Sequence, residues 1–131
     1  MFLTAFIAIL NTATGELEYV NAGHNPPAIK LDDKFEYLQS SHNFILSAMK
    51  NYEYKSSKII LKPGNNILIY TDGVTEAQNT KEELYGDERL INLLNSTDKE
   101  PKEIIESIKA NIIEFSNGAP QFDDITILDI K

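Results

Sequence analysis

The stretch Ile67-Leu-Ile-Tyr-Thr-Asp-Gly-Val-Thr-Glu-Ala77 contains an apolar run that ends abruptly at Asp72-Gly73. The apolar residues predict a buried strand over residues 66–70, with the aspartate at the rim of the sheet and the glycine allowing the chain to turn. A carboxylate at the end of a buried strand costs free energy unless a positive charge meets it. This stretch therefore predicts both the centre of the fold and a candidate site.

Two further carboxylates, Asp123 and Asp124, precede the last apolar segment of the chain. If one of them lies about 4 Å from Asp72, the two charges repel by about 4 kcal/mol at an effective dielectric constant near 20. A divalent cation with oxygen ligands would remove that cost. Neighbouring residues of a strand point to opposite faces, so at most one of the pair faces Asp72, and parity does not choose between them.

The composition limits the class of protein. With 131 residues, of which 42% are apolar, we expect one folded domain over residues 1–131. The net charge of -8, with no stripe of basic residues, argues against nucleic-acid binding. The chain contains no cysteine, and its opening apolar segment, residues 1–10, is too short to span a bilayer. We therefore expect a cytoplasmic protein without membrane contact.

The hydrophobic pattern favours an α+β domain with helices outside the sheet. Turns before residue 71 are too short for parallel crossovers, so the strands should be antiparallel. The first and last strands are apolar at nearly every position, which predicts that both of their faces are covered by other parts of the protein. A Pro-Gly turn predicts that strand 52–61 pairs with strand 66–70 as a hairpin. The expected strands are residues 1–10, 16–21, 28–31, 35–38, 52–61, 66–70 and 125–130, and the expected helices are residues 87–94 and 101–115.

Four ordered motifs resemble the second half of a stage II sporulation E type serine phosphatase domain, which belongs to the metal-dependent, type 2C protein phosphatases. The resemblance runs over the whole chain. The motifs are Asn21-Ala-Gly-His-Asn-Pro-Pro27, Leu68-Ile-Tyr-Thr-Asp-Gly-Val-Thr-Glu-Ala77, Tyr85-Gly-Asp-Glu-Arg-Leu90 and Asp123-Asp-Ile-Thr126.

The resemblance implies a layered sandwich of two antiparallel sheets flanked by helices, with two Mg²⁺ or Mn²⁺ ions at one edge. Metal-activated water would attack phosphorus without a phosphoenzyme. By position, Asp72 and Asp123 match metal ligands, Gly73 lets the backbone turn near the metal, and Asp124 supports the site by hydrogen bonding. His24 stands where many relatives carry an aspartate, although a histidine in such a loop is more often structural, held here by Asn21 or Asn25.

The resemblance implies a phosphorylated protein as substrate, of the anti-anti-sigma type, and a homodimer is left open. The sequence departs from the family because it lacks the first-half Asp-x-x-Gly-His-Gly segment, whose aspartate bridges both metals. We therefore expect a domain that is incomplete at its N-terminus and an isolated chain that is inactive. The alternative is a noncatalytic interaction module that retains the fold. A haloacid-dehalogenase phosphatase is disfavoured, because Tyr70 stands where that chemistry needs a nucleophilic aspartate.

Overall fold

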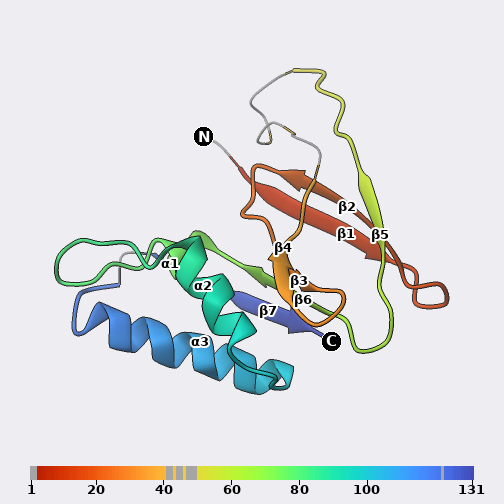
Figure 1. Ribbon diagram of the computed structural model, residues 1–131. Coiled ribbons are helices and arrows are strands. Elements are labelled where there is room, and N and C mark those ends of the chain that lie inside the picture. Colours follow the sequence, from red (N-terminus) through yellow and green to blue (C-terminus); the bar gives the residue numbers. More distant parts are fainter. Residues whose placement is uncertain (1–2, 41–42, 44–45, 47–49, 122) are drawn as a thin grey trace. The chain divides into compact units, whose positions relative to one another are not determined.

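The computed structural model describes residues 3–40, 43, 46, 50–121 and 123–131 (Figure 1). Its elements form two compact units, one made of Met1–Pro26 and Leu38–Pro63 and the other of Pro27–Tyr37 and Gly64–Lys131. Each unit contains one antiparallel sheet. The expected α+β fold with two antiparallel sheets is confirmed, whereas the single domain over residues 1–131 stays a prediction.

The first unit holds a sheet of three strands in the order β1-β2-β5. Asn11 sets the turn between the first two strands, because its side-chain oxygen accepts hydrogen bonds from the amides of Ala13 (3.0 Å) and Thr14 (3.2 Å). Leu17 and Tyr19 are buried on one face of β2. The strands are β1 (Ala5–Leu10), β2 (Glu16–Ala22) and β5 (Ser57–Ile60).

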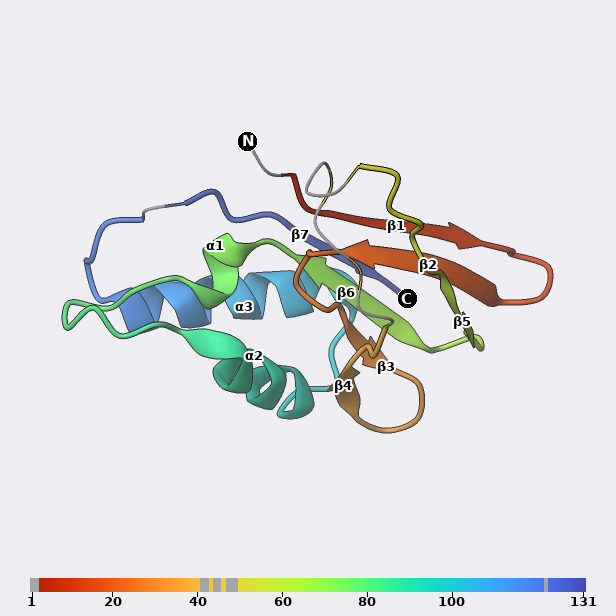
Figure 2. The same ribbon diagram turned by 90° about the horizontal axis from the view of Figure 1, so that it is seen from above.

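The second unit holds a sheet of four strands in the order β4-β3-β6-β7, with three helices. Strand β6 lies inside this sheet and pairs with both β3 and β7. Helix α2 contacts β4 and α3 contacts β7, and Figure 2 shows these two helices beside the sheet. The elements are β3 (Ala28–Lys30), β4 (Phe35–Tyr37), β6 (Asn66–Tyr70), α1 (Asp72–Thr75), α2 (Gly86–Asn95), α3 (Pro101–Ser116) and β7 (Ile127–Ile130).

Helix α3 forms where its apolar period predicts it. Pro101 occupies the first turn, and the helix ends at Ser116 before two left-handed residues, Asn117 (φ 45°) and Gly118 (φ 91°). Its buried isoleucines pack with side chains of β6 and α2 into the core of the second unit. The core residues are Ala28, Phe35, Leu68, Tyr70, Val74, Tyr85, Leu90, Leu94, Ile104, Ile108 and Ile112.

The hairpin expected between residues 52–61 and 66–70 is wrong. Only Ser57–Ile60 of the first segment is a strand, and it pairs with β2, whereas β6 pairs in the other sheet. Gly64, with a φ of 90°, provides the turn that the Pro-Gly pair predicted. This turn, however, connects strands of two different sheets. The prediction failed because an apolar alternation specifies a strand and its faces but not the strand with which it pairs.

The cover expected on both faces of the first and last strands is also incomplete within the part of the chain that the structure describes, since α3 packs on one face of β7 and the other face is exposed. Strand β1 is at the edge of its sheet, and Ile7 and Ile9 are 62% and 72% exposed. Strand β7 is likewise an edge strand, beginning at Ile127 and not at Ile125, with Leu128 52% exposed. Among the described strands, each of these two pairs with a neighbour along one edge only. Residues 1 and 2 of the expected first strand lie outside the described residues.

No helix among the described residues is both long enough and apolar enough to cross a membrane.

Candidate functional site

Asp72 lies where the central strand of the second unit ends. Strand β6 stops at Tyr70, Thr71 is extended (φ -97°, ψ 167°), and Asp72 is the first residue of the short helix α1. The Asp72 residue is exposed, as expected at a sheet rim. Its carboxylate therefore keeps contact with water, and the desolvation cost inferred from the buried strand does not arise.

The residues after β6 run alongside the residues before β7. The Thr71 amide donates to the Thr126 carbonyl (3.1 Å), one step beyond the pairing of Tyr70 with Ile127. The Thr71 hydroxyl donates to the Asp124 carbonyl (3.0 Å) and accepts from the Thr126 amide (3.0 Å). We call residues 71–73 and 123–126 together the aspartate edge.

Gly73 is needed in the aspartate edge because the Asp124 backbone lies too close for a side chain at this position. A Cβ atom on this buried residue would lie 2.1 Å from the Asp124 carbonyl oxygen and 2.7 Å from its carbonyl carbon. Gly73 is a residue of α1 and is not among the glycines with positive φ. Its role is therefore to let two backbones touch, and not to supply the special turn conformation expected from the sequence.

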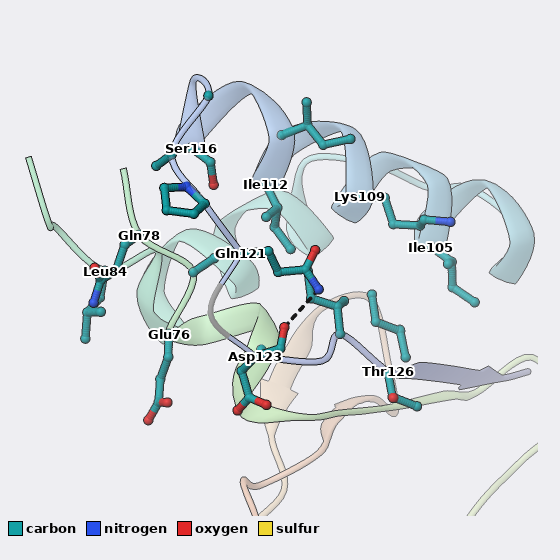
Figure 3. A pocket seen from close by; sticks show the side chains of 18 residues that line it. Glu76, Gln78, Leu84, Ile105, Lys109, Ile112, Ser116, Gln121, Asp123 and Thr126 are labelled. Atoms are coloured by element: carbon teal, nitrogen blue, oxygen red, sulfur yellow. Dashed lines mark hydrogen bonds between the residues drawn. The ribbon is translucent and has the colours of Figure 1, made fainter. Parts of the chain in front are cut away.

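Asp123 and Asp124 are exposed and precede β7, so the alternation of a strand does not govern where they point. One Asp123 carboxylate oxygen accepts from the Asp124 amide (2.8 Å), and the Gln121 side chain donates to the Asp123 carbonyl (2.9 Å). Asp123 lines a cavity of about 920 Å³ together with Glu76. Figure 3 shows both carboxylates pointing away from α3, on the side of α1.

His24 belongs to the first unit. Its backbone amide donates to the Asn21 side-chain oxygen (2.8 Å), and its Nδ1 atom donates to the Asn25 carbonyl (2.9 Å). These are the contacts of a histidine that fixes its own loop. A role for His24 at a metal site stays a prediction.

The carboxylates of the aspartate edge have no neutralising partner among the described residues. The salt bridges between described residues lie elsewhere: they join Lys30 to Asp98, Lys58 to Glu16 and Lys131 to Glu100. Hard cations such as Mg²⁺ and Mn²⁺ prefer carboxylate oxygens, so the donors fit such an ion in kind. Within the described ranges, however, three or more His, Cys, Asp or Glu side chains are nowhere grouped to hold a metal. The aspartate edge therefore fits part of a metal site.

Tyr70 lies directly before the aspartate edge and is only 1% exposed. Burial, followed by the nearby Tyr37 and Asp87, raises the pKa of the Tyr70 phenol well above its ordinary value of 10. A buried neutral phenol cannot act as the nucleophile of a haloacid-dehalogenase phosphatase. The structure thus agrees with the sequence in disfavouring that chemistry.

Sequence reasoning did not identify Thr71 as part of the candidate site. Its hydroxyl bonds both Asp124 and Thr126, although α1 begins directly after it and its side chain caps no helix amide. The available signal was a threonine between a strand end and an aspartate. That signal also fits an ordinary N-cap, so it could not reveal a contact with residues 123–126.

Comparison with known proteins identifies the family. Residues 1–131 match the family described as stage II sporulation protein E (SpoIIE). Protein IcfG of Synechocystis sp. is 32% identical over 130 residues, which are 99% of this chain and 20% of that protein. Phosphoserine phosphatase RsbU of Bacillus subtilis is 32% identical over 80 residues, which are 60% of this chain and 24% of that protein. The chain thus spans a quarter or less of these relatives.

Solved structures share the fold. The SiaA-PP2C domain of Pseudomonas aeruginosa superposes with a TM-score of 0.81 at 22% identity, covering 98% of this chain and 51% of that one. The phosphatase domain of SpoIIE from Bacillus subtilis, presoaked with Mn, gives a TM-score of 0.75 at 19% identity, covering 98% and 56%. The chain therefore corresponds to about half of these domains. Because the family match extends over the whole sequence, the chain belongs to the SpoIIE family of PP2C-type serine phosphatase domains.

Proposed function

We propose that this chain supplies part of the active site of a Mg²⁺- or Mn²⁺-dependent protein phosphatase that hydrolyses phosphoserine or phosphothreonine. One observation carries the proposal: the aspartate edge joins Asp72 and Asp123, distant in sequence, on segments whose backbones touch. Both residues are exposed, and neither takes part in a salt bridge with a described residue. Two such carboxylates attract a divalent cation.

Asp72 and Asp123 would hold the cation in this mechanism. A bound divalent cation supplies positive charge to the phosphoryl oxygens and makes the attacking water more acidic. The Asp124 amide orients the Asp123 carboxylate by its hydrogen bond of 2.8 Å. Gly73 brings the two aspartate-bearing segments into contact, and the Asp124 side chain supports the site by hydrogen bonding.

The substrate we propose is a phosphorylated regulatory protein of the anti-anti-sigma type, in the cytoplasm. Two relatives from Bacillus subtilis, RsbU and RsbP, are phosphoserine phosphatases. A solved chain of Mycobacterium tuberculosis with the same fold joins RsbU and RsbW domains. A phosphoprotein substrate in sigma-factor regulation is consistent with both.

We further propose that the isolated chain has little activity. Two ions require more ligands than two aspartates offer, and among the described residues no third ligating side chain joins them in a cluster. The remaining ligands would come from elsewhere in a complete domain. The same observation supports one alternative, a noncatalytic interaction module that retains the phosphatase fold.

The test is Mn²⁺ binding by calorimetry, with the chain as it is and with a version extended toward the N-terminus. We expect weak binding by the chain and tighter binding by the extended version. Asp72→Asn or Asp123→Asn should weaken both by at least about tenfold. The control Asp33→Asn removes an exposed carboxylate from the turn between β3 and β4 and should change nothing.

Two outcomes would contradict these proposals. Equal, tight binding by both lengths would show that the site is complete within this chain. Failure of both lengths to bind Mn²⁺ would reject Asp72 and Asp123 as ligands and favour the noncatalytic module.

A further inference from the structure

One hydroxyl group joins the two halves of the aspartate edge. The Thr71 Oγ1 atom donates to the Asp124 carbonyl (3.0 Å) and at the same time accepts from the Thr126 amide (3.0 Å). A side chain at the N-cap caps a helix by accepting from a helix amide, but the Thr71 hydroxyl accepts from no amide of α1, and both of its bonds cross to the other segment. The side chain that stands at the N-cap position of α1 is therefore used to hold residues 123–126 and not to cap the helix.

We propose that Thr71 is a positioning residue of the phosphatase site, which holds Asp123 at the place where it can share a cation with Asp72. This inference rests on the proposed function. It goes beyond the proposed function because it assigns a role to a side chain that binds neither the cation nor the substrate.

The backbone alone does not provide this restraint. The last ladder pair of β6 and β7 is Tyr70 with Ile127, and the Thr71 amide adds one bond to the Thr126 carbonyl (3.1 Å). Asp123 lies beyond that bond. Contact of Gly73 with the Asp124 carbonyl limits how closely the segments approach, but a steric limit does not draw them together. The hydroxyl provides the attraction.

The expected size of the effect follows from what misplaced ligands cost. A metal ligand needs to lie within about 0.5 Å of its productive position. Losing a group that orients a ligand typically lowers metal affinity by 10–100-fold. Removal of the Thr71 hydroxyl should therefore weaken Mn²⁺ binding by at least about tenfold, without removing a ligand.

The experiment compares Thr71→Val, which keeps the side-chain shape, with Thr71→Ser, which keeps the hydroxyl. Thr14→Val is the matched control, because the Thr14 hydroxyl also accepts a hydrogen bond from a backbone amide. That amide belongs to Glu16 (3.3 Å), in the first unit. Two quantities are measured by NMR on the full chain: the exchange rate of the Thr126 amide without metal, and Mn²⁺ affinity from paramagnetic broadening of residues 72–73 and 123–126. Exchange rates of α3 amides report whether each variant remains folded.

We expect Thr71→Val to speed Thr126 exchange by about fivefold, consistent with the loss of one net hydrogen bond of about 1 kcal/mol, and to weaken Mn²⁺ binding at least about tenfold. Thr71→Ser and Thr14→Val should stay within about twofold of the wild-type chain. Unchanged Thr126 exchange or unchanged Mn²⁺ affinity in Thr71→Val would overturn the inference. If the wild-type chain shows no broadening at these residues, the proposed ligands are wrong, and Thr126 exchange still decides whether the hydroxyl holds the segment.

Discussion

Replacing Gly73 by alanine tests whether backbone contact defines the aspartate edge. Gly73 lies in the short helix α1, where alanine is ordinarily favoured over glycine by about 1 kcal/mol. Helix propensity alone thus predicts a more stable protein. The structure predicts the opposite sign, because the new Cβ atom would lie 2.1 Å from the Asp124 carbonyl oxygen.

The magnitude follows from the displacement that the methyl group demands. Ordinary contact begins at 3.4 Å, so the two backbones would have to separate by about 1.3 Å. Overpacking of this kind costs about 1–3 kcal/mol, and the bond from the Thr71 hydroxyl to the Asp124 carbonyl, worth about 1 kcal/mol, would be stretched or lost. After subtracting the gain in helix propensity, we expect a net destabilisation of roughly 1–3 kcal/mol.

The assay is urea unfolding followed by circular dichroism, with Gly118→Ala as the control. Gly118 has a φ of 91° and open space around its Cβ position, so its substitution costs about 1–2 kcal/mol through backbone strain alone. Both variants should lose stability, but only Gly73→Ala should speed exchange of the Thr126 amide. A Gly73→Ala variant as stable as the wild-type chain, with unchanged exchange, would refute the reasoning.

Three further predictions concern the second unit. Burial raises the pKa of Asp129, whose Oδ1 atom, like that of Asn66, lacks a hydrogen-bond partner among the described residues. A raised native pKa makes the ionised carboxylate a cost above that pKa, so Asp129→Asn should raise the thermal midpoint at pH 7, and the gain should shrink as the pH falls toward 4. Asn95→Ala should cost about 1–3 kcal/mol in urea unfolding, because its side chain bonds both the amide (2.7 Å) and the carbonyl (3.1 Å) of Phe35; an unchanged midpoint would show that water replaces these bonds. Tyr85→Phe should cost about 1–2 kcal/mol in the same assay, since the buried phenol donates to an asparagine of α3, and no loss would mean that this bond contributes nothing net.

Local patterns in the sequence predicted local structure well. The isoleucine period between Pro101 and Gly118 predicted α3 almost to its ends, because a fixed φ suits the first turn and a left-handed residue suits the stop. The apolar run before Asp72 predicted the central strand β6. In both cases, residues close in sequence carry the signal.

Strand pairing and contacts between segments distant in sequence could not be predicted in the same way. The Pro-Gly turn before β6 predicts a hairpin, yet β5 pairs with β2 and β6 pairs with β3 and β7. The choice between Asp123 and Asp124 could not follow from strand parity, since the strand begins at Ile127. Nor does the sequence reveal that Gly73 faces the Asp124 carbonyl. These contacts depend on tertiary packing.

The exposure of Asp72 and Asp123 changes the physical argument for a metal site. Two carboxylates 4 Å apart repel by about 4 kcal/mol in a partly shielded site but only about 1 kcal/mol in water. Because both residues are exposed, the hydrogen bonds of Thr71 to Asp124 and Thr126 can hold the two segments together without a cation. The fold then does not depend on metal to form, and the binding free energy of an ion is not consumed in assembling the edge. We therefore expect a chelator to leave the unfolding midpoint of the isolated chain unchanged, and a large fall would show that the cation assembles the aspartate edge.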